Sequence, residues 1–292
     1  MRKIAIVVDT NSSIDAVEAE ELGVFLLQMP IIVDGQEYIE GRDITYDEFF
    51  ERLGNGAEVS TSQPSPESVT SLWDQVLQEY DELLHFPMSA ALSSSCATAK
   101  ALAVDYGDRV HVIDNRRISI TLRSSVMDAI TLVKSGKYSG AEIAERLEAA
   151  GPDQSIYIAV NTLELLKKSG RVTAAGAALA SVLSIKPVLT IQGGKLDAYQ
   201  KCRGMNAAEK CMLKVILSEL EGRFAGKEVR LDVAYSGSRE SAEKWLASVR
   251  KFIAEQEAFA HLQVTMARLP LSICCHIAEG AHALGISEVY KD

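Results

Sequence analysis

The sequence has no excess of positive charge, and this is the first of several features that it lacks. Its 292 residues include 30 Lys and Arg against 40 Asp and Glu, which gives a formal net charge of −10 at pH 7. Proteins that bind nucleic acid non-specifically, or that dock stably on an anionic membrane, need a basic surplus. We therefore expect no nucleic-acid partner and at most a transient contact with a membrane.

Cysteine and histidine are too few and too irregularly spaced for a disulfide framework or a metal site. The five cysteines, an odd number, include no CxxC pair, and the five histidines show no HExxH spacing. Disulfide scaffolds and zinc sites depend on such regular spacings. The sequence therefore predicts a protein without a bound metal.

Long hydrophobic runs are also missing. The apolar run at residues 4–8 ends at Asp9 and is too short for the apolar region of a signal peptide. The most apolar stretch, residues 174–191, is interrupted by Lys186 and Pro187 and falls short of the ~20 residues that span a bilayer. A cytoplasmic location is the resulting expectation.

The common nucleotide-binding and hydrolase signatures do not occur. The sequence has no GxxxxGK[ST], no GxGxxG after its first apolar run, and no GxSxG. The first two motifs place phosphate groups at a helix N-terminus, and the third exposes a nucleophilic serine on a sharp turn. Without them the sequence predicts no cofactor.

Two patterns of predicted secondary structure follow one another along the chain. Over about the first half, short apolar runs alternate with amphipathic segments, as in a parallel sheet covered by helices. In the second half, a hairpin around Gly193 and Gly194 is combined with crossover connections. We predict an α/β protein of two domains. Residues 1–160 form a parallel α/β/α sheet and residues 161–292 a mixed α/β sheet, with the boundary placed to within about a dozen residues.

Three hydroxyl-rich segments point to a ligand site: residues 10–13, residues 60–65, and Ser89 with residues 93–95. We expect them to gather at the carboxyl edge of the parallel sheet, where ligands bind. Helix N-termini and hydroxyl groups there suit one small anionic group, either a carboxylate or a phosphate. A helix cap explains any single segment better. Caps need only one hydroxyl each, however, and leave the convergence of three segments unexplained.

Three further residues each have two interpretations. Arg171 follows a lysine-rich helix end, and Arg203 precedes a glycine. Each arginine is either a solvated cation near a helix terminus or part of a docking surface for an acidic partner. His276 is either a structural histidine or the base for a serine nucleophile such as Ser93.

Six short segments, spread along the chain, match the signature of one known family. Residues 61–66 match its TSQPSP segment without a change, and residues 4–10 resemble its opening strand and Asp-Thr turn. Leu92-Ser93 matches the start of its LSGT segment, and residues 166–171 resemble its glycine-arginine turn. Residues 185–189 resemble its lysine-proline strand, and His276 aligns with the histidine of its HTGPG segment. On these segments the chain resembles the DegV family, bacterial fatty-acid-binding proteins that serve fatty acid kinase.

The resemblance implies a non-catalytic carrier with one long-chain fatty acid, of palmitate, stearate or oleate type, held between or beside two domains. Thr61 and Ser93 are implied to bind the carboxylate, with Ser62 and Ser94 next to them. His276 is implied to close the head-group site from the second domain. The acyl chain is implied to run into an apolar tunnel in the N-terminal, lipid-binding domain.

The implied partner is a separate ATP-dependent fatty acid kinase, which phosphorylates the bound carboxyl group to an acyl phosphate for phospholipid synthesis. Arg171 and Arg203 are implied to face that kinase. Two segments depart from the family pattern. Ser94-Ser95 stands in place of Gly-Thr, where a glycine could adopt a backbone angle that is costly for serine. Glu279 lies three residues after His276 and would repel a carboxylate if it pointed inward.

Two other functions stay open from the sequence. One is a serine hydrolase acting on acyl or phosphoryl esters, with Ser93 as nucleophile and His276 as base. The other is a regulatory module that binds a different small anion. Turnover of an ester would identify the hydrolase. A ligand that raises the melting temperature would identify the module, because such a ligand binds only the folded state.

Overall fold

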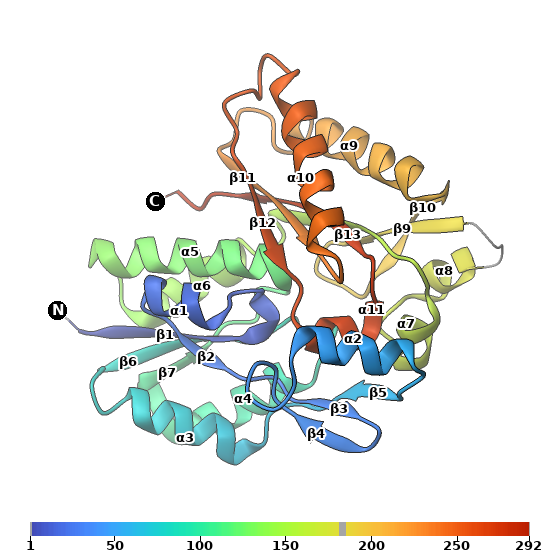
Figure 1. The fold of residues 1–292 in the computed structure, drawn as a ribbon. Coiled ribbons are helices and arrows are strands. Elements are labelled where there is room, and N and C mark those ends of the chain that lie inside the picture. The colour runs from blue at the N-terminus through green and yellow to red at the C-terminus, as the bar shows by residue number, and fades with distance from the viewer. Residues whose placement is uncertain (1, 181–184, 292) are drawn as a thin grey trace.

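The fold is built on two large β-sheets and a smaller one, seen in a computed structural model that describes residues 2–180 and 185–291 (Figure 1). The expected α/β class is confirmed, with a parallel sheet followed by a separate mixed sheet. Within the apolar stretch at residues 174–191, residues 181–184 lie outside the described part. No helix among the described residues is both long enough and apolar enough to cross a membrane.

The first sheet has four parallel strands in the order β2-β1-β6-β7. Its central strands are almost continuous apolar runs because helices cover both of its faces. In Figure 1, α1, α5 and α6 lie on one face, and α3 and α4 lie on the other. The elements are β1 (Ile4–Asp9), η1 (Thr10–Ser12), α1 (Ala16–Leu22), β2 (Phe25–Leu27), α3 (Pro66–Val76), β6 (Glu82–Phe86), α4 (Ser95–Ala103), η2 (Val104–Arg109), β7 (Val110–Val112), α5 (Ser119–Ser135) and α6 (Gly140–Ala149).

A small antiparallel sheet, in the order β4-β3-β5, is inserted between β2 and α3. The turn between β3 and β4 is tight because Asp34 and Gly35 both have positive φ, 50° and 79°, as a type I′ turn requires. The pairing of β5 with β3 sets Thr61 opposite Ile31. The elements are β3 (Ile31–Val33), β4 (Gln36–Tyr38), α2 (Tyr46–Gly54) and β5 (Val59–Thr61).

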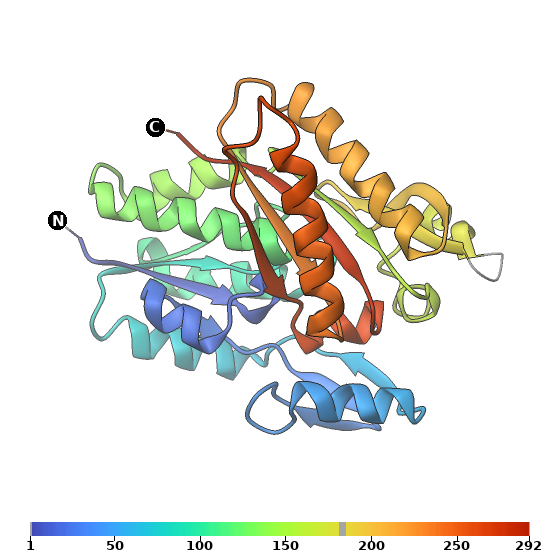
Figure 2. The ribbon, with the colours of Figure 1, turned by 45° about the horizontal axis from the view of Figure 1, so that its top comes forward.

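The third sheet is mixed and has six strands in the order β10-β9-β8-β13-β11-β12, of which only β11 and β12 pair in parallel. Figure 2 shows α9 and α10 lying across its outer face, where they bury one apolar cluster. The elements are β8 (Gln154–Ala159), α7 (Glu164–Ser169), α8 (Ala174–Ala177), η3 (Ala178–Ala180), β9 (Ile185–Ile191), β10 (Asp197–Arg203), α9 (Met205–Glu221), β11 (Val229–Tyr235), α10 (Arg239–Ala254), β12 (Val264–Arg268), α11 (Leu271–Ile277) and β13 (His282–Glu288).

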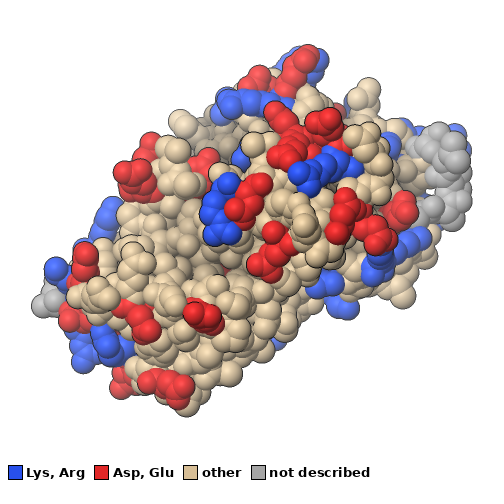
Figure 3. Space-filling model, turned by 60° about the horizontal axis from the view of Figure 1, so that its bottom comes forward, with Lys and Arg blue, Asp and Glu red and all other residues tan. Residues whose placement is uncertain are grey.

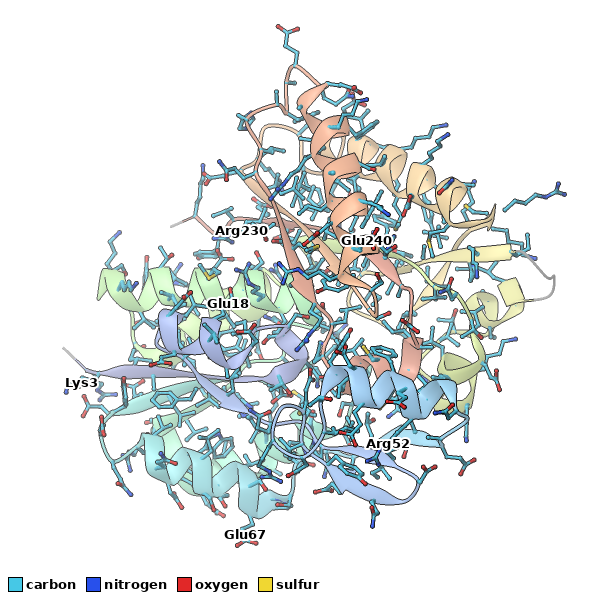
Figure 4. All side chains as sticks on the ribbon, viewed as in Figure 1. Lys3, Glu18, Arg52, Glu67, Arg230 and Glu240 are labelled. Atoms are coloured by element: carbon cyan, nitrogen blue, oxygen red, sulfur yellow. The ribbon has the colours of Figure 1, made fainter. Side chains whose placement is uncertain are left out.

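Ion pairs join α5 of the parallel-sheet part to β11 of the six-stranded sheet. Arg230 of β11 donates to the carboxylate of Asp128 at 2.7 Å. Arg123 of α5 donates to Glu18 and also lies 3.8 Å from Asp232 of β11. Figure 4 labels Arg230 and Glu18 on the two sides of this junction. These contacts hold the inner face of the six-stranded sheet in a fixed position against α5.

The structure corrects two details of the sequence interpretation. The strand β8, which a boundary at residue 160 assigns to the first domain, belongs to the six-stranded sheet. The change of sheet therefore falls at residues 150–153, within the margin that the prediction allowed, and the division into two domains stays a prediction. The sequence interpretation also missed β5, α11 and β13, and both β5 and α11 carry predicted site residues.

Candidate functional site

A cavity lies where the carboxyl ends of β1, β2 and β6 face the inner side of the six-stranded sheet. It encloses about 200 Å³, far above the ~10–15 Å³ that one water molecule needs, so it is not a packing defect. Six of the seven residues singled out in the sequence line this cavity. They are Thr61, Ser62, Ser93, Ser94, Arg171 and His276.

Thr61 is the last residue of β5, and its hydroxyl group meets His276 from a distant part of the chain. The Thr61 Oγ1 atom lies 3.1 Å from His276 Nε2. The neighbouring Ser60 is exposed, because successive side chains of a strand point to opposite faces. The strand β5 therefore presents one hydroxyl to the cavity and one to solvent.

The loop after Thr61 is fastened to the start of α4 by hydroxyl groups. Gln63 Oε1 accepts hydrogen bonds from Ser94 Oγ at 3.0 Å and from Thr98 Oγ1 at 3.1 Å. Ser93 Oγ accepts from the backbone N–H of Ser95 at 3.1 Å. The two bonds to Gln63 bring the second hydroxyl-rich segment to the third and to the start of α4, as the sequence predicted.

His276 sits in the short helix α11 and is mostly buried. Burial, reinforced by the positive charge of Arg171, lowers the pKa of His276 to about 4, so the imidazole is neutral near pH 7. Its Nδ1 is buried and has no hydrogen-bond partner among the described residues. Within that part of the chain no hydrogen bond joins His276 to Ser93 and no carboxylate orients the ring, which removes the geometry that a Ser93–His276 hydrolase needs.

The two predicted arginines lie in different places. Arg171 is half-buried in the cavity wall, where its Nε donates to the carbonyl of Leu92 at 3.4 Å and its Nη1 donates to the carbonyl of Ser169. Arg203 is exposed on the edge strand β10 and does not line the cavity. On the face of the molecule in Figure 3, basic and acidic side chains are interspersed and form no continuous basic area.

The remainder of the cavity wall is apolar and comes from both parts of the chain. The parallel-sheet part supplies Met29, Met88, Leu92, Ile118 and Ile120. Ile156 and Ile158 of β8 face the cavity, whereas Tyr157 between them packs against α9 in the outer core. Further apolar lining comes from Ile191, Ala234 and Ala283 on the neighbouring strands, and from Leu166, Leu196, Leu269, Ile273 and Ile277. The resemblance implied a tunnel within the N-terminal domain, whereas the apolar space of this cavity lies between the two large sheets and is lined from both.

A sequence profile described as "Uncharacterised protein, DegV family" matches residues 3–289. The chain belongs to the DegV family. It is 34% identical over 206 residues to a DegV domain-containing protein of Deinococcus radiodurans. The aligned region covers 70% of this chain and 73% of the Deinococcus protein.

Solved DegV structures match almost the whole chain. One, described as "Fatty Acid Binding of a DegV family Protein from Thermus thermophilus", superposes with a TM-score of 0.85 at 28% identity and covers 99% of this chain and 100% of that one. A fatty-acid-binding DegV family protein from Streptococcus agalactiae gives a TM-score of 0.82 at 25% identity and covers 98% and 99% of the two chains.

The two departures from the DegV pattern are compatible with the site. Ser94 has a φ of −78°, so the position needs no glycine, and its hydroxyl gains the bond to Gln63. Glu279 does not line the cavity but faces surface pockets on the other side of the loop after α11. The repulsion that an inward-pointing Glu279 would cause is therefore avoided.

Four further polar residues of this DegV protein line the cavity: Gln63, whose hydrogen bonds are given above, and Asn11, Ser119 and Ser272. Ser272 of α11 donates to the side-chain carbonyl of Asn11 at 2.6 Å. Ser119, at the start of α5, shares a hydrogen bond of 2.9 Å with Ser13 and has a φ of 53°. Asn11 is the only residue of the first hydroxyl-rich segment in the cavity wall. Asn11 could be found from that segment, whereas nothing in the local sequence distinguishes Ser119 or Ser272.

Proposed function

We propose that this protein binds one long-chain fatty acid in the cavity between its two large sheets. Its carboxylate would lie at Thr61 and Ser93, with Ser62, Ser94 and His276 around it. One observation carries the proposal: a cluster of hydroxyl groups opens into a continuous apolar space within the same cavity. The fatty-acid-binding relatives, which share the family and the fold, support the same ligand class.

The apolar wall supplies most of the binding free energy in this proposal. Each methylene that leaves water contributes about 0.8 kcal/mol, so the tail of a palmitate-, stearate- or oleate-type acid gains many times that amount. The head-group site then only has to offset the cost of taking a carboxylate out of water. Hydroxyl donors and the N-terminus of α4 meet that requirement without a dedicated salt bridge.

The neutral character of the head-group site suits the presentation of the carboxylate to a separate ATP-dependent kinase. His276 is uncharged near pH 7, and two nitrogens of Arg171 already donate to backbone carbonyls. A carboxylate held mainly by neutral donors keeps more of its charge for attack on a phosphoryl group. The protein carries the fatty acid and the kinase performs the chemistry, in the cytoplasm and for phospholipid synthesis.

Extraction of the purified protein tests the binding proposal. We expect organic extraction and mass spectrometry to give close to one C14–C20 fatty acid per chain. The delipidated protein should also take up added palmitate or oleate. An Ala283→Phe variant, whose ring would fill the apolar space, is the matched control and should yield little lipid. A wild-type extract without fatty acid, together with no uptake, would refute the proposal.

Phosphorylation of the bound acid tests the kinase role separately. With ATP and a fatty acid kinase, protein loaded with oleate should yield acyl phosphate. A Ser93→Lys variant should slow that step even when it is fully loaded, because an ammonium group beside the carboxylate would lower its nucleophilicity. Equal rates for both proteins would contradict the presentation role but leave lipid binding intact.

A further inference from the structure

A second hydrogen-bonded serine–histidine pair lies outside the fatty-acid cavity and does have a carboxylate behind its histidine. Ser241 Oγ is 3.2 Å from His282 Nε2, and His282 Nδ1 is 2.7 Å from Glu209 Oε1. The three residues come from α10, β13 and α9, so only the folded chain brings them together. None of the three lines the fatty-acid cavity.

The histidine of this group is fixed in orientation, and the serine is open to solvent. The side chain of His282 is 6% exposed, and its ring stacks on Trp245 with a 2° angle between the planes. Glu209 holds Nδ1, which leaves Nε2 directed at Ser241. Ser241 is exposed and lines a surface pocket together with Ser236, Asn161, Phe50 and Leu53.

Unpaired backbone donors lie next to Ser241 in the same helical turn. The backbone N–H groups of Arg239 and Glu240 open the 16-residue helix α10 and have no acceptor among the described residues. The N–H of Ser241 itself donates to the hydroxyl of Ser238. Figure 4 labels Glu240 in this first turn. Such N–H groups can stabilise the oxyanion of a tetrahedral intermediate.

We propose that Ser241, His282 and Glu209 form a nucleophilic site that accepts an acyl group from a neutral ester. Ser241 Oγ forms a bond to the acyl carbon while its proton moves to His282 Nε2. The ester C–O bond then breaks, and the leaving alcohol takes that proton. Water releases the acid from Ser241 by the reverse sequence. Glu209 acts as a positioning residue that orients the ring and stabilises its protonated form.

The charges around the pocket select against anionic substrates. Glu279 lines the pocket, and no lysine or arginine among the described residues lines it; the exposed Glu240 beside Ser241 is paired with Lys244. A carboxylate or phosphate ester would be repelled by Glu279, whereas a neutral ester would not. The apolar side chains of Phe50 and Leu53 on α2 also line the pocket, which suits a short acyl chain.

Covalent labelling tests the nucleophile directly. The full-length protein is incubated with a fluorophosphonate probe, which loses fluoride as serine Oγ bonds to phosphorus, and the adduct is located by peptide mass spectrometry. We expect one adduct on Ser241 and a loss of ~100-fold or more in labelling rate for Ser241→Ala. Ser248→Ala, further along α10, is the matched control and should label like wild type.

Three outcomes would overturn the proposal. They are an adduct mapped to another serine, labelling that persists in Ser241→Ala, and wild-type labelling no faster than that of Ser241→Ala. Loss of labelling in Ser93→Ala would likewise assign the reaction to the fatty-acid cavity. Hydrolysis of 4-nitrophenyl butyrate should follow the same pattern across these variants, each checked for an unchanged melting temperature.

The role of Glu209 is tested by comparing two substitutions. Glu209→Gln keeps a hydrogen-bond acceptor but removes the charge that stabilises the protonated ring, so the labelling rate should fall ~10-fold or more. Glu209→Asp restores the charge and should recover part of that rate. Equal rates for the Gln and Asp variants would show that Glu209 has only a structural role.

Discussion

The two large sheets contribute different chemistry to the same cavity. The parallel sheet and the small sheet beside it contribute loops, strand ends and a helix N-terminus, which place Thr61 and Ser93 in the cavity wall together with apolar side chains such as Met88 and Ile118. The six-stranded sheet contributes a strand face, on which Ile156 and Ile158 form a regular apolar surface. Loops can place individual donors at one point, whereas a strand face repeats one kind of side chain over a length. A ligand with a small polar end and a long apolar chain requires both.

The helix α11 is the exception to this division. It belongs to the C-terminal part of the chain, yet it places His276 and Ser272 against polar residues of the parallel-sheet part. The proposed head-group site is therefore completed only when the two parts of the chain are in contact.

The largest effect is expected from filling the apolar side of the cavity. Ala283→Phe adds a ring at a buried position on β13 that lines the cavity. Exclusion of only four methylenes forfeits about 3 kcal/mol at 0.8 kcal/mol each, so affinity for palmitate should fall ~100-fold or more. Isothermal titration would measure this loss. Butyrate has too few methylenes to cover much of this wall, so its affinity should change far less. Equal palmitate affinity of wild type and variant would contradict the role of the six-stranded sheet as the apolar wall.

The next effect concerns His276 in the lipid-free protein. The pKa of its imidazole is about 4 in the folded chain and near 6.5 when unfolded. Between these values only the unfolded state takes up a proton, so the stability that this group contributes is present above pH 6.5 and lost as the pH falls towards 4. The loss is of the order of 3 kcal/mol.

Urea unfolding at pH 7 and pH 4.5 would measure this loss for the wild type and for His276→Gln. Glutamine can keep a bond to Thr61 but does not titrate, so most of the extra acid sensitivity should disappear. An unchanged pH dependence would contradict the burial of His276 in the head-group site.

A smaller effect is expected at the hydroxyl groups. Thr61→Ala and Ser93→Ala each remove one hydrogen bond to a charged ligand, which should weaken palmitate binding by about 1–3 kcal/mol. Ser60→Ala is the matched control, because Ser60 is exposed beside Thr61 on β5 and does not line the cavity. Fluorescence competition assays at one pH and one salt concentration would compare the three variants. Similar losses in all three would remove the special role of the cavity-facing hydroxyl.

The smallest effect on lipid binding is expected at Arg203. Because it is exposed outside the cavity, Arg203→Ala should leave the Kd for palmitate within about twofold. If Arg203 contacts the kinase, the same variant should raise the KM for the loaded protein. Arg171→Ala should weaken lipid binding as well, since Arg171 is part of the cavity wall. A loss of lipid affinity in Arg203→Ala would contradict its placement outside the site.

The polar side of the cavity could be predicted from the sequence better than the apolar side. The serines and threonines that follow strands or precede helices identify a carboxyl edge, and residues 61–66 identify the family. The apolar wall could not be predicted, because the alternation of Ile156, Tyr157 and Ile158 gives two faces without saying which one borders a cavity. That assignment depends on the packing of α9 on one face.

The missed elements have physical reasons. The three residues of β5 form a strand only by pairing with β3, and a short polar segment gives no local signal for such pairing. The helix α11 has seven residues, no side-chain cap and almost complete burial, so it shows neither a capping signal nor an amphipathic pattern. His276 could therefore be found only through the family resemblance, not through its helix.

A crystal structure of the protein saturated with palmitate is the most direct test of this account. Continuous electron density should run from a carboxylate within hydrogen-bond distance of Thr61 and Ser93 along the surface formed by Ile156 and Ile158. Density that places the carboxylate elsewhere, or a cavity that remains empty under saturating palmitate, would contradict it.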